Sequence, residues 1–263
     1  MRTILPWALA LAMAAAPAAI TAQNGDAVAQ KNADQARAAL NQMVQALGGE
    51  LWLNINNVET EGHIAAFFQG NPDLGTTDYF YYHQWPDRDR IELTKHRDDV
   101  LFYIGNQGWE VTYRGKKALP KDQVDDFLLR RDYSIETVVK VWLKDPRTIL
   151  TYEGPHLVER HLGVQVSAIS ADNQAVTIVL DTDSHLPLRE QFQSRNPVYH
   201  DLDTYAEEYD DYHTIDGFPT PFTITRIKNG DVVQQRYVTR VKYNQNLPAD
   251  FWDPNAAARH IKR

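Results

Sequence analysis

Serine and histidine are the residues of this chain that could supply a hydrolytic nucleophile and its base, because the sequence contains no cysteine. The candidate serines are Ser134, Ser167, Ser170, Ser184 and Ser194. None of them lies in the G-x-S-x-G turn that exposes a nucleophile. Ser184 and His185 are neighbours in a polar turn, but a catalytic triad is assembled by the fold and not by adjacency in sequence. We therefore predict no catalytic residue and no enzymatic activity.

Metal ligands would require histidine or carboxylate side chains that share one face of an element. The chain lacks the H-E-x-x-H motif, and His156 and His161 are five residues apart, which places them on opposite faces of a strand. The acidic segment 201–211 lacks the glycine and the spacing of a calcium loop, and its interleaved tyrosines are typical of a solvated strand. We predict no metal and no cofactor. A carboxylate pair for glycoside hydrolysis remains open, because sequence does not give the separation of two carboxyl groups.

Aromatic side chains are the more informative feature. In the predicted strand 76–85, alternation places Tyr79, Tyr81 and His83 on one face, and Phe80 and Tyr82 on the other. Both faces therefore need a covering. In a curved sheet one face can be the core and the other a cavity wall for an apolar ligand, or helices can fill that space completely.

The elements that must position these side chains follow from hydrophobic periodicity and turn residues. One apolar stripe predicts a helix over 32–47, which ends at Gly48-Gly49. Five strands are predicted next, at 58–68, 76–85, 88–95, 100–105 and 109–113. Two helices follow, at 120–131 and 134–143. The remaining strands are predicted at 148–152, 157–169 with a kink near Gly163, 174–180, 188–194, 204–213, 222–228 and 232–243.

Short links between these strands indicate antiparallel neighbours, and Asn229-Gly230 is the strongest hairpin signal. A sheet of so many strands tends to curl, and the apolar faces of the helices must be buried against it. We therefore predict a mainly β fold with some helix. Its curved antiparallel sheet forms an incomplete, half-open β-barrel with an N-terminal helix and a helical lid.

The N-terminal segment has the layout of a cleavable secretory signal: a basic start at Arg2, an apolar stretch, and small residues up to Ala22. We expect residues 1–22 to be the signal peptide and 23–263 a single exported domain in the periplasm. No cysteine is available for lipid attachment, and charges interrupt every later apolar stretch, so an integral membrane protein is not expected. A net charge of −8 also disfavours a nucleic-acid partner.

Several short patterns recur in a characteristic order along the chain. They are Ala46-Leu47-Gly48-Gly49, Gly62, Pro86-Asp87-Arg88, Gly108-Trp109, Tyr113, Asp181, Leu186-Pro187, Tyr212, Ile215-Asp216-Gly217-Phe218-Pro219, Pro221, Asn246-Leu247, Phe251 and Pro254. Together with the order of elements, they resemble the LolA/LolB superfamily, in particular the LolA-like periplasmic outer-membrane lipoprotein-sorting proteins.

The resemblance implies a periplasmic carrier or chaperone for an acylated or lipidic ligand, in lipoprotein or lipid trafficking to the outer membrane. Its partners would be lipid or lipoprotein acyl chains and transfer proteins of the inner and outer membranes. By the same resemblance, the cavity wall would include Tyr79, Tyr81, Leu93, Phe102 and Trp109, and the lid Phe127, Leu128, Val138 and Trp142. The alternatives are a non-catalytic envelope scaffold or assembly factor with a filled core and, less favoured, a periplasmic hydrolase.

Overall fold

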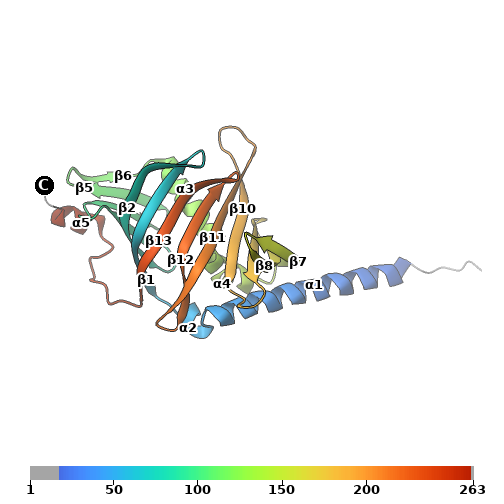
Figure 1. Ribbon diagram of the computed structural model, residues 1–263. Helices are drawn as coiled ribbons and strands as arrows, with labels where there is room; N and C mark the ends of the chain where they lie inside the picture. Colours follow the sequence, from blue (N-terminus) through green and yellow to red (C-terminus); the bar gives the residue numbers. More distant parts are fainter. Residues whose placement is uncertain (1–17, 262–263) are drawn as a thin grey trace, which may run out of the picture.

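A single antiparallel sheet dominates the protein in a computed structural model that describes residues 18–261. Its thirteen strands follow the order β6-β5-β4-β3-β2-β1-β13-β12-β11-β10-β9-β8-β7, so β6 and β7 are the edges and the sheet does not close on itself. Figure 1 shows the sheet curving around α3 and α4, with α1 at the end that holds β7 and β8. The predicted fold class, a curved and open antiparallel sheet with an N-terminal helix and further helices, is confirmed.

The strands fall into two blocks separated by helices. The first block contains β1 (Asn57–Phe68), β2 (Asn71–Gln84), β3 (Arg88–Leu93), β4 (Asp99–Ile104), β5 (Gln107–Thr112) and β6 (Gly115–Ala118). The second contains β7 (Ile149–Val158), β8 (His161–Ile169), β9 (Ala175–Asp181), β10 (Pro187–Arg195), β11 (Leu202–Ile215), β12 (Phe218–Lys228) and β13 (Asp231–Tyr243). The helices are α1 (Ala18–Leu47), α2 (Glu50–Leu53), α3 (Lys121–Tyr133), α4 (Ile135–Lys140), the short 3-10 helix η1 (Trp142–Lys144) and α5 (Pro254–His260).

Several details differ from the sequence prediction. Helix α1 begins before residue 32, and its N-terminal part extends beyond the sheet in Figure 1. The predicted strand 157–169 is wrong, because the chain reverses after Val158, where Glu159 has a positive φ, and two paired strands result. Strand β6 and helices α2 and α5 were not predicted. The predicted secretion signal falls mainly on residues 1–17, outside the described part of the chain.

The main core lies on the concave face, between α1, α4 and the strands β7 to β11. Leu40 and Met43 of α1 are fully buried there. The apolar stripe of α1 supplies this contact because residues three and four apart share one helix face. Asn32 fixes the helix to the edge strand, since its side chain accepts from Tyr152 N and donates to Tyr152 O, both at 2.8 Å.

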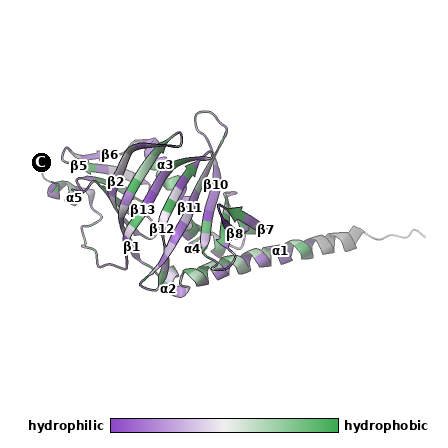
Figure 2. Ribbon diagram, viewed as in Figure 1, coloured by the Kyte–Doolittle hydropathy of each residue, from purple (hydrophilic) through white to green (hydrophobic). Residues whose placement is uncertain are grey.

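Helix α3 covers the other half of the concave face, over β3 to β5. The close approach depends on Gly108, because a Cβ atom there would lie 2.7 Å from Val124 Cγ2 of the helix. Figure 2 shows hydrophobic and hydrophilic residues mixed along the strands. Such mixing is expected for strands whose two faces meet different surroundings. No helix of the described residues is long and apolar enough to cross a bilayer.

Candidate ligand-binding cleft

A cavity of about 290 Å³ lies between α3 and the concave face of the sheet. We call it the inner cleft. Its apolar wall consists of Ile64, Tyr79, Tyr81, Ile91, Leu93 and Leu101 from β1 to β4, and Phe127 of α3 faces this wall. The volume is near the lower end of about 300–1,000 Å³ for small-molecule sites. The inner cleft therefore combines an apolar wall with enough space for part of a ligand.

Phe127 packs helix α3 against the sheet. Its ring stacks on Tyr103 of β4 with a centroid distance of 3.7 Å and an interplanar angle of 5°. Arg131, one turn further along α3, donates to Gly105 O at 2.9 Å. These two contacts hold α3 over the inner cleft, and Phe127 also lines the cleft.

Charged side chains lie at the base of the inner cleft and in an adjoining cavity of about 160 Å³, which shares Arg226 and Arg236 with it. Glu190, Glu207, Arg226 and Gln234 lie opposite one another on the adjacent strands β10 to β13. Arg226 Nε donates to Glu207, and Arg236 Nη2 lies 3.3 Å from each carboxylate oxygen of the same residue. Burial alone would raise the pKa of Glu207, but the two arginines outweigh it and lower the pKa to about 2. One carboxylate is therefore shared by two guanidinium groups.

The pKa of Glu190 is shifted in the opposite direction from that of Glu207. The Glu190 carboxyl group is buried, and burial together with the nearby charge of Glu207 raises its pKa to about 8. It accepts a hydrogen bond from the backbone N–H of Ile135 at 2.9 Å, at the first residue of α4. At neutral pH this side chain is thus largely protonated and holds the start of α4 against the sheet.

A pH-dependent stability follows from Glu190. The pKa in the folded protein lies above the ordinary 4.5, so the stabilisation is complete below about pH 4.5 and is lost as pH rises through about 8. We expect the wild-type free energy of unfolding to decline over this window by up to roughly 1.4 kcal/mol per pH unit for this proton. In Glu190→Gln this part of the decline should be absent, whereas Glu50→Gln, on an exposed residue, should match wild type. Urea unfolding at several pH values measures the slopes, and equal slopes in all three proteins would contradict the assignment.

His83 connects the sheet to α4. Its Nδ1 lies 2.7 Å from Asp89 Oδ1 and its Nε2 lies 3.1 Å from Glu136 Oε2, while Lys140 pairs with Glu136 at 2.6 Å. Burial would lower the pKa of His83, but the hydrogen bonds and charges of Asp89 and Glu136 raise it to about 10. The imidazole is therefore cationic at neutral pH and bridges two carboxylates, that of Asp89 on the sheet and that of Glu136 on α4.

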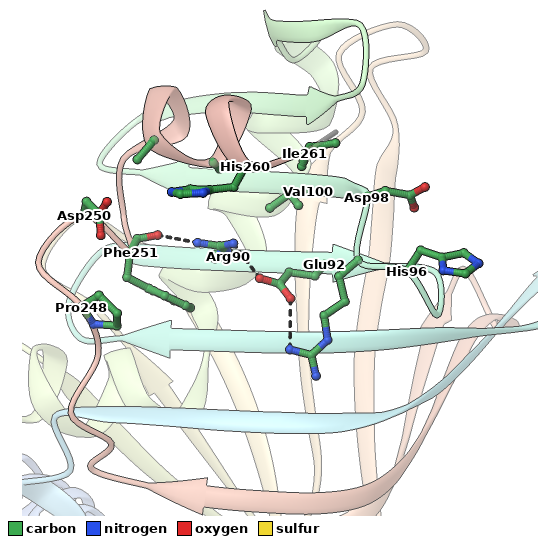
Figure 3. Close-up of a pocket in the computed structure, with 13 residues that line it drawn as sticks. Arg90, Glu92, His96, Asp98, Val100, Pro248, Asp250, Phe251, His260 and Ile261 are labelled. Carbon is green, nitrogen blue, oxygen red and sulfur yellow. Dashed lines mark hydrogen bonds and ion pairs between the residues drawn. The ribbon is translucent and has the colours of Figure 1, made fainter. Parts of the chain in front are cut away.

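A second cavity, of about 690 Å³, lies on the outer face between β3, β4 and the C-terminal segment (Figure 3). Arg90 occupies its centre: the guanidinium donates to Phe251 O and pairs with Glu92 Oε1, each at 2.7 Å. The Arg90 guanidinium carbon also lies 4.3 Å from the Phe251 ring centroid. Arg97 pairs with Glu92 from the other side at 3.4 Å. These contacts anchor the C-terminal segment to the sheet.

The structure separates the residues predicted from sequence into four places. Tyr79, Tyr81, Leu93 and Phe127 line the inner cleft. Leu128 packs beside Tyr103 in the small core under α3. Phe102 and Trp109 lie on the outer face in a core closed by Ala257 of α5, and Val138 and Trp142 are buried in the main core. Ligand contact remains a prediction for all of these residues.

The charged base was not predicted. Arg226, Arg236, Glu207 and Glu190 are separated along the chain and meet only through strand pairing. In the sequence the two arginines appear only as charged residues on the two segments that flank Asn229-Gly230, a pattern that does not give their pairing. Among the described residues, no group of three or more histidine, aspartate or glutamate side chains could hold a metal ion.

Comparison with known proteins finds similarity in structure alone. No family model matches the sequence, and no curated protein matches it. Among solved structures, the chain is similar to a domain from Vibrio parahaemolyticus assigned as an outer membrane lipoprotein-sorting protein, with 10% identity and a TM-score of 0.56 over 87% of this chain and 100% of that one.

Two further solved structures agree. A DUF1329 family protein from Desulfovibrio piger has 12% identity and a TM-score of 0.57 over 84% of this chain and 98% of its own. A LolA superfamily protein from Nitrosomonas europaea has 13% identity and a TM-score of 0.53 over 82% of this chain and 96% of its own. At these identities the likeness is one of fold. The chain therefore shares its fold with these solved structures, one of which is a LolA superfamily protein, and this likeness of fold agrees with the resemblance predicted from its sequence.

Proposed function

We propose that this protein is a periplasmic carrier that binds the acyl part of a lipidic or lipidated ligand in the inner cleft. The observation that carries the proposal is the apolar wall of Tyr79, Ile91, Leu93 and Leu101 facing Phe127 across a cavity of about 290 Å³. Each methylene that leaves water for such a wall contributes about 0.8 kcal/mol. The likeness to lipoprotein-sorting domains supports the same role, in lipoprotein or lipid trafficking to the outer membrane.

Loading would require the lid to move, because the cleft is small for a whole acyl chain. Helix α3 rests on the Phe127–Tyr103 stack and on the hydrogen bond from Arg131 to Gly105. The packing of Val124 and Leu128 in the small core under α3 adds to these contacts. Opening would expose this small core, so an entering chain would have to replace the Tyr103 contact of Phe127 with its own.

The test is native mass spectrometry with organic extraction of the protein purified from periplasm without detergent. We expect bound acyl species in wild type and their loss in Phe127→Asp, because a carboxylate in the apolar cleft opposes burial of a hydrocarbon chain. Phe68→Asp is the matched control, since Phe68 is 70% exposed and lies away from the cleft lining. Circular dichroism must show both variants folded.

The contrary result is a wild-type protein without acyl species that also fails to bind a fluorescent acyl probe. This outcome would favour the second candidate, an envelope scaffold with a filled interior. The main core supports that candidate, because α1 and α4 already fill the concave face over β7 to β11. A carrier and a scaffold therefore differ only in what the inner cleft holds.

A further inference from the structure

The base of the inner cleft carries an excess of positive charge. Three arginines, Arg130, Arg226 and Arg236, line the cavity together with one carboxylate, that of Asp126. Asp126 pairs with Arg130 at 3.1 Å, so Arg226 and Arg236 face the cavity beside a single partner, Glu207, which they share. Arg130 also lies over the Tyr205 ring, 5.0 Å from its centroid. One guanidinium charge is therefore left without a carboxylate of its own.

Arg236 is the member of this pair with unused hydrogen-bonding capacity. Its Nη2 reaches Glu207, whereas its Nε is buried and has no hydrogen-bond partner within the described part of the chain. A buried donor without a partner costs about 1–3 kcal/mol, so the hydrogen bonds of the Arg236 guanidinium are incomplete within the protein. Ile64 lies directly opposite Arg236 on the neighbouring strand, and Ile64 is part of the apolar wall. The cation and the apolar wall are thus adjacent in the same cavity.

The carboxyl groups around this base do not cancel the excess. In the adjoining cavity, Asp89 and Glu136 both hold the cationic His83, and Arg131 lies 4.0 Å from Asp89. Burial beside Glu207 raises the pKa of Glu190 to about 8, so this carboxyl group contributes little negative charge at neutral pH. The field at the base of the inner cleft is therefore positive.

We propose that the inner cleft selects amphipathic anions: a phosphate or carboxylate head group at Arg236 and Arg226, with the hydrocarbon chain along Ile64, Tyr79, Leu93 and Leu101. This inference rests on the proposed function and adds the class of head group to it. Arginine suits the role, because its planar group donates two parallel hydrogen bonds to phosphate or carboxylate oxygens.

The experiment compares four ligands with the same palmitoyl chain at concentrations below micelle formation. They are lysophosphatidylglycerol and palmitate, which are anionic, lysophosphatidylcholine, which is zwitterionic, and monopalmitin, which is neutral. Each displaces a neutral fluorescent probe, N-phenylnaphthylamine, from the wild-type protein. We expect at least one anionic ligand to bind about tenfold more tightly than monopalmitin, as one charge-assisted hydrogen bond provides. Comparison of lysophosphatidylglycerol with palmitate distinguishes a phosphate preference from a carboxylate preference.

Substitutions test which residue causes the preference for anionic ligands. In Arg236→Gln the ratio of anionic to neutral affinity should fall to about one, while monopalmitin should still bind, because the apolar wall is unchanged. Arg236→Lys should retain part of the ratio. Arg240→Gln is the matched control from the same strand, since Arg240 is 60% exposed and pairs with Glu61 at 2.9 Å away from the cleft. The ratio of anionic to neutral affinity in Arg240→Gln should equal that of wild type.

Failure of the anion selectivity and failure of the carrier function give different results in this experiment. Equal affinity of wild type for all four ligands would overturn the anion selectivity and leave the proposed carrier function standing. Binding of none of them would overturn the carrier function and this inference together. A tenfold preference that persists in Arg236→Gln would also contradict the assignment of the head-group site to Arg236.

Discussion

Glu207→Gln is expected to lower the free energy of unfolding by about 3 kcal/mol, at the lower end of the range for breaking a buried ion pair. The side chains involved are largely withdrawn from water: Glu207 is 14% exposed, Arg236 15% and Arg226 24%. Glutamine keeps the shape of the side chain but removes the charge that both arginines share. Two cations would then face each other across the base of the inner cleft without a counter-ion, and their repulsion adds to the lost attraction.

Urea unfolding at neutral pH, followed by far-ultraviolet circular dichroism, measures this effect. Asp125→Asn is the control, because Asp125 pairs with Lys121 on the exposed surface of α3, where the two side chains are 55% and 86% exposed. An exposed pair of this kind contributes at most about 1 kcal/mol. If Glu207→Gln were no more destabilising than this control, the two arginines would not depend on Glu207 and the described charge balance would be wrong.

Trp142→Ala is expected to lower the free energy of unfolding by about 3–5 kcal/mol, the usual cost of truncating a buried tryptophan. Trp142 is 5% exposed and belongs to the main core, where its ring meets Tyr133 edge-on at a centroid distance of 5.7 Å. Its backbone carbonyl accepts a hydrogen bond from Thr148 Oγ1 at 2.6 Å. Alanine would leave a cavity where α4, η1 and the sheet meet, and the surrounding strands cannot collapse into it freely.

Val141→Ala is the matched control for this position, since its side chain is 51% exposed and precedes Trp142 directly. We expect it to change stability by less than about 0.5 kcal/mol. The acyl affinity of folded Trp142→Ala protein should equal that of wild type, because Trp142 does not line the inner cleft. A folded Trp142→Ala protein with normal stability and lost ligand binding would instead place Trp142 in the lid, as the family resemblance implied.

Much of the sheet was predictable because its strands alternate in polarity and end at residues with clear turn chemistry. Asn229-Gly230 predicted the β12–β13 hairpin, and the structure has both residues at positive φ in that turn. The reversal at Glu159 between β7 and β8 could not be read, because no glycine, proline or asparagine marks it. The start of helix α5 carries a recognisable signal, because the Asp253 side chain accepts a hydrogen bond from Asn255 N and Pro254 is the first helical residue. With seven residues, however, the helix is too short for its hydrophobic periodicity to be recognised in the sequence.

The site was predictable only in part. The aromatic alternation of β2 correctly places Tyr79 and Tyr81 on one face, which is the face of the inner cleft. Phe102 and Trp109 show the limit: alternation says that they share a face but not which face of the sheet it is, and α5 covers that face. Only a covering element that packs from elsewhere in the chain decides this.

The charged base depends on strand register. A register shift between Arg226 and Ile227 pairs Arg226 with Gln234, whereas the uninterrupted hairpin from Lys228 and Asp231 would pair Arg226 with Val233. Because a shift of one residue exchanges the two faces of a strand, this irregularity helps to turn Arg236 toward the cleft. No feature of the local sequence announces such a shift, so sequence alone could not bring Arg226, Arg236 and Glu207 together.

The central claim, that an acyl chain occupies the inner cleft, is tested most directly by photocrosslinking with a diazirine-bearing palmitate analogue and mapping the modified peptides. We predict adducts on the inner-face residues of β2 to β4 and on α3, including Tyr79, Leu93, Leu101 and Phe127, and their suppression by unlabelled palmitate. Adducts confined to the outer cavity, at Arg97, Phe251 or Ile261, would contradict the account and move the ligand to the opposite face of the sheet.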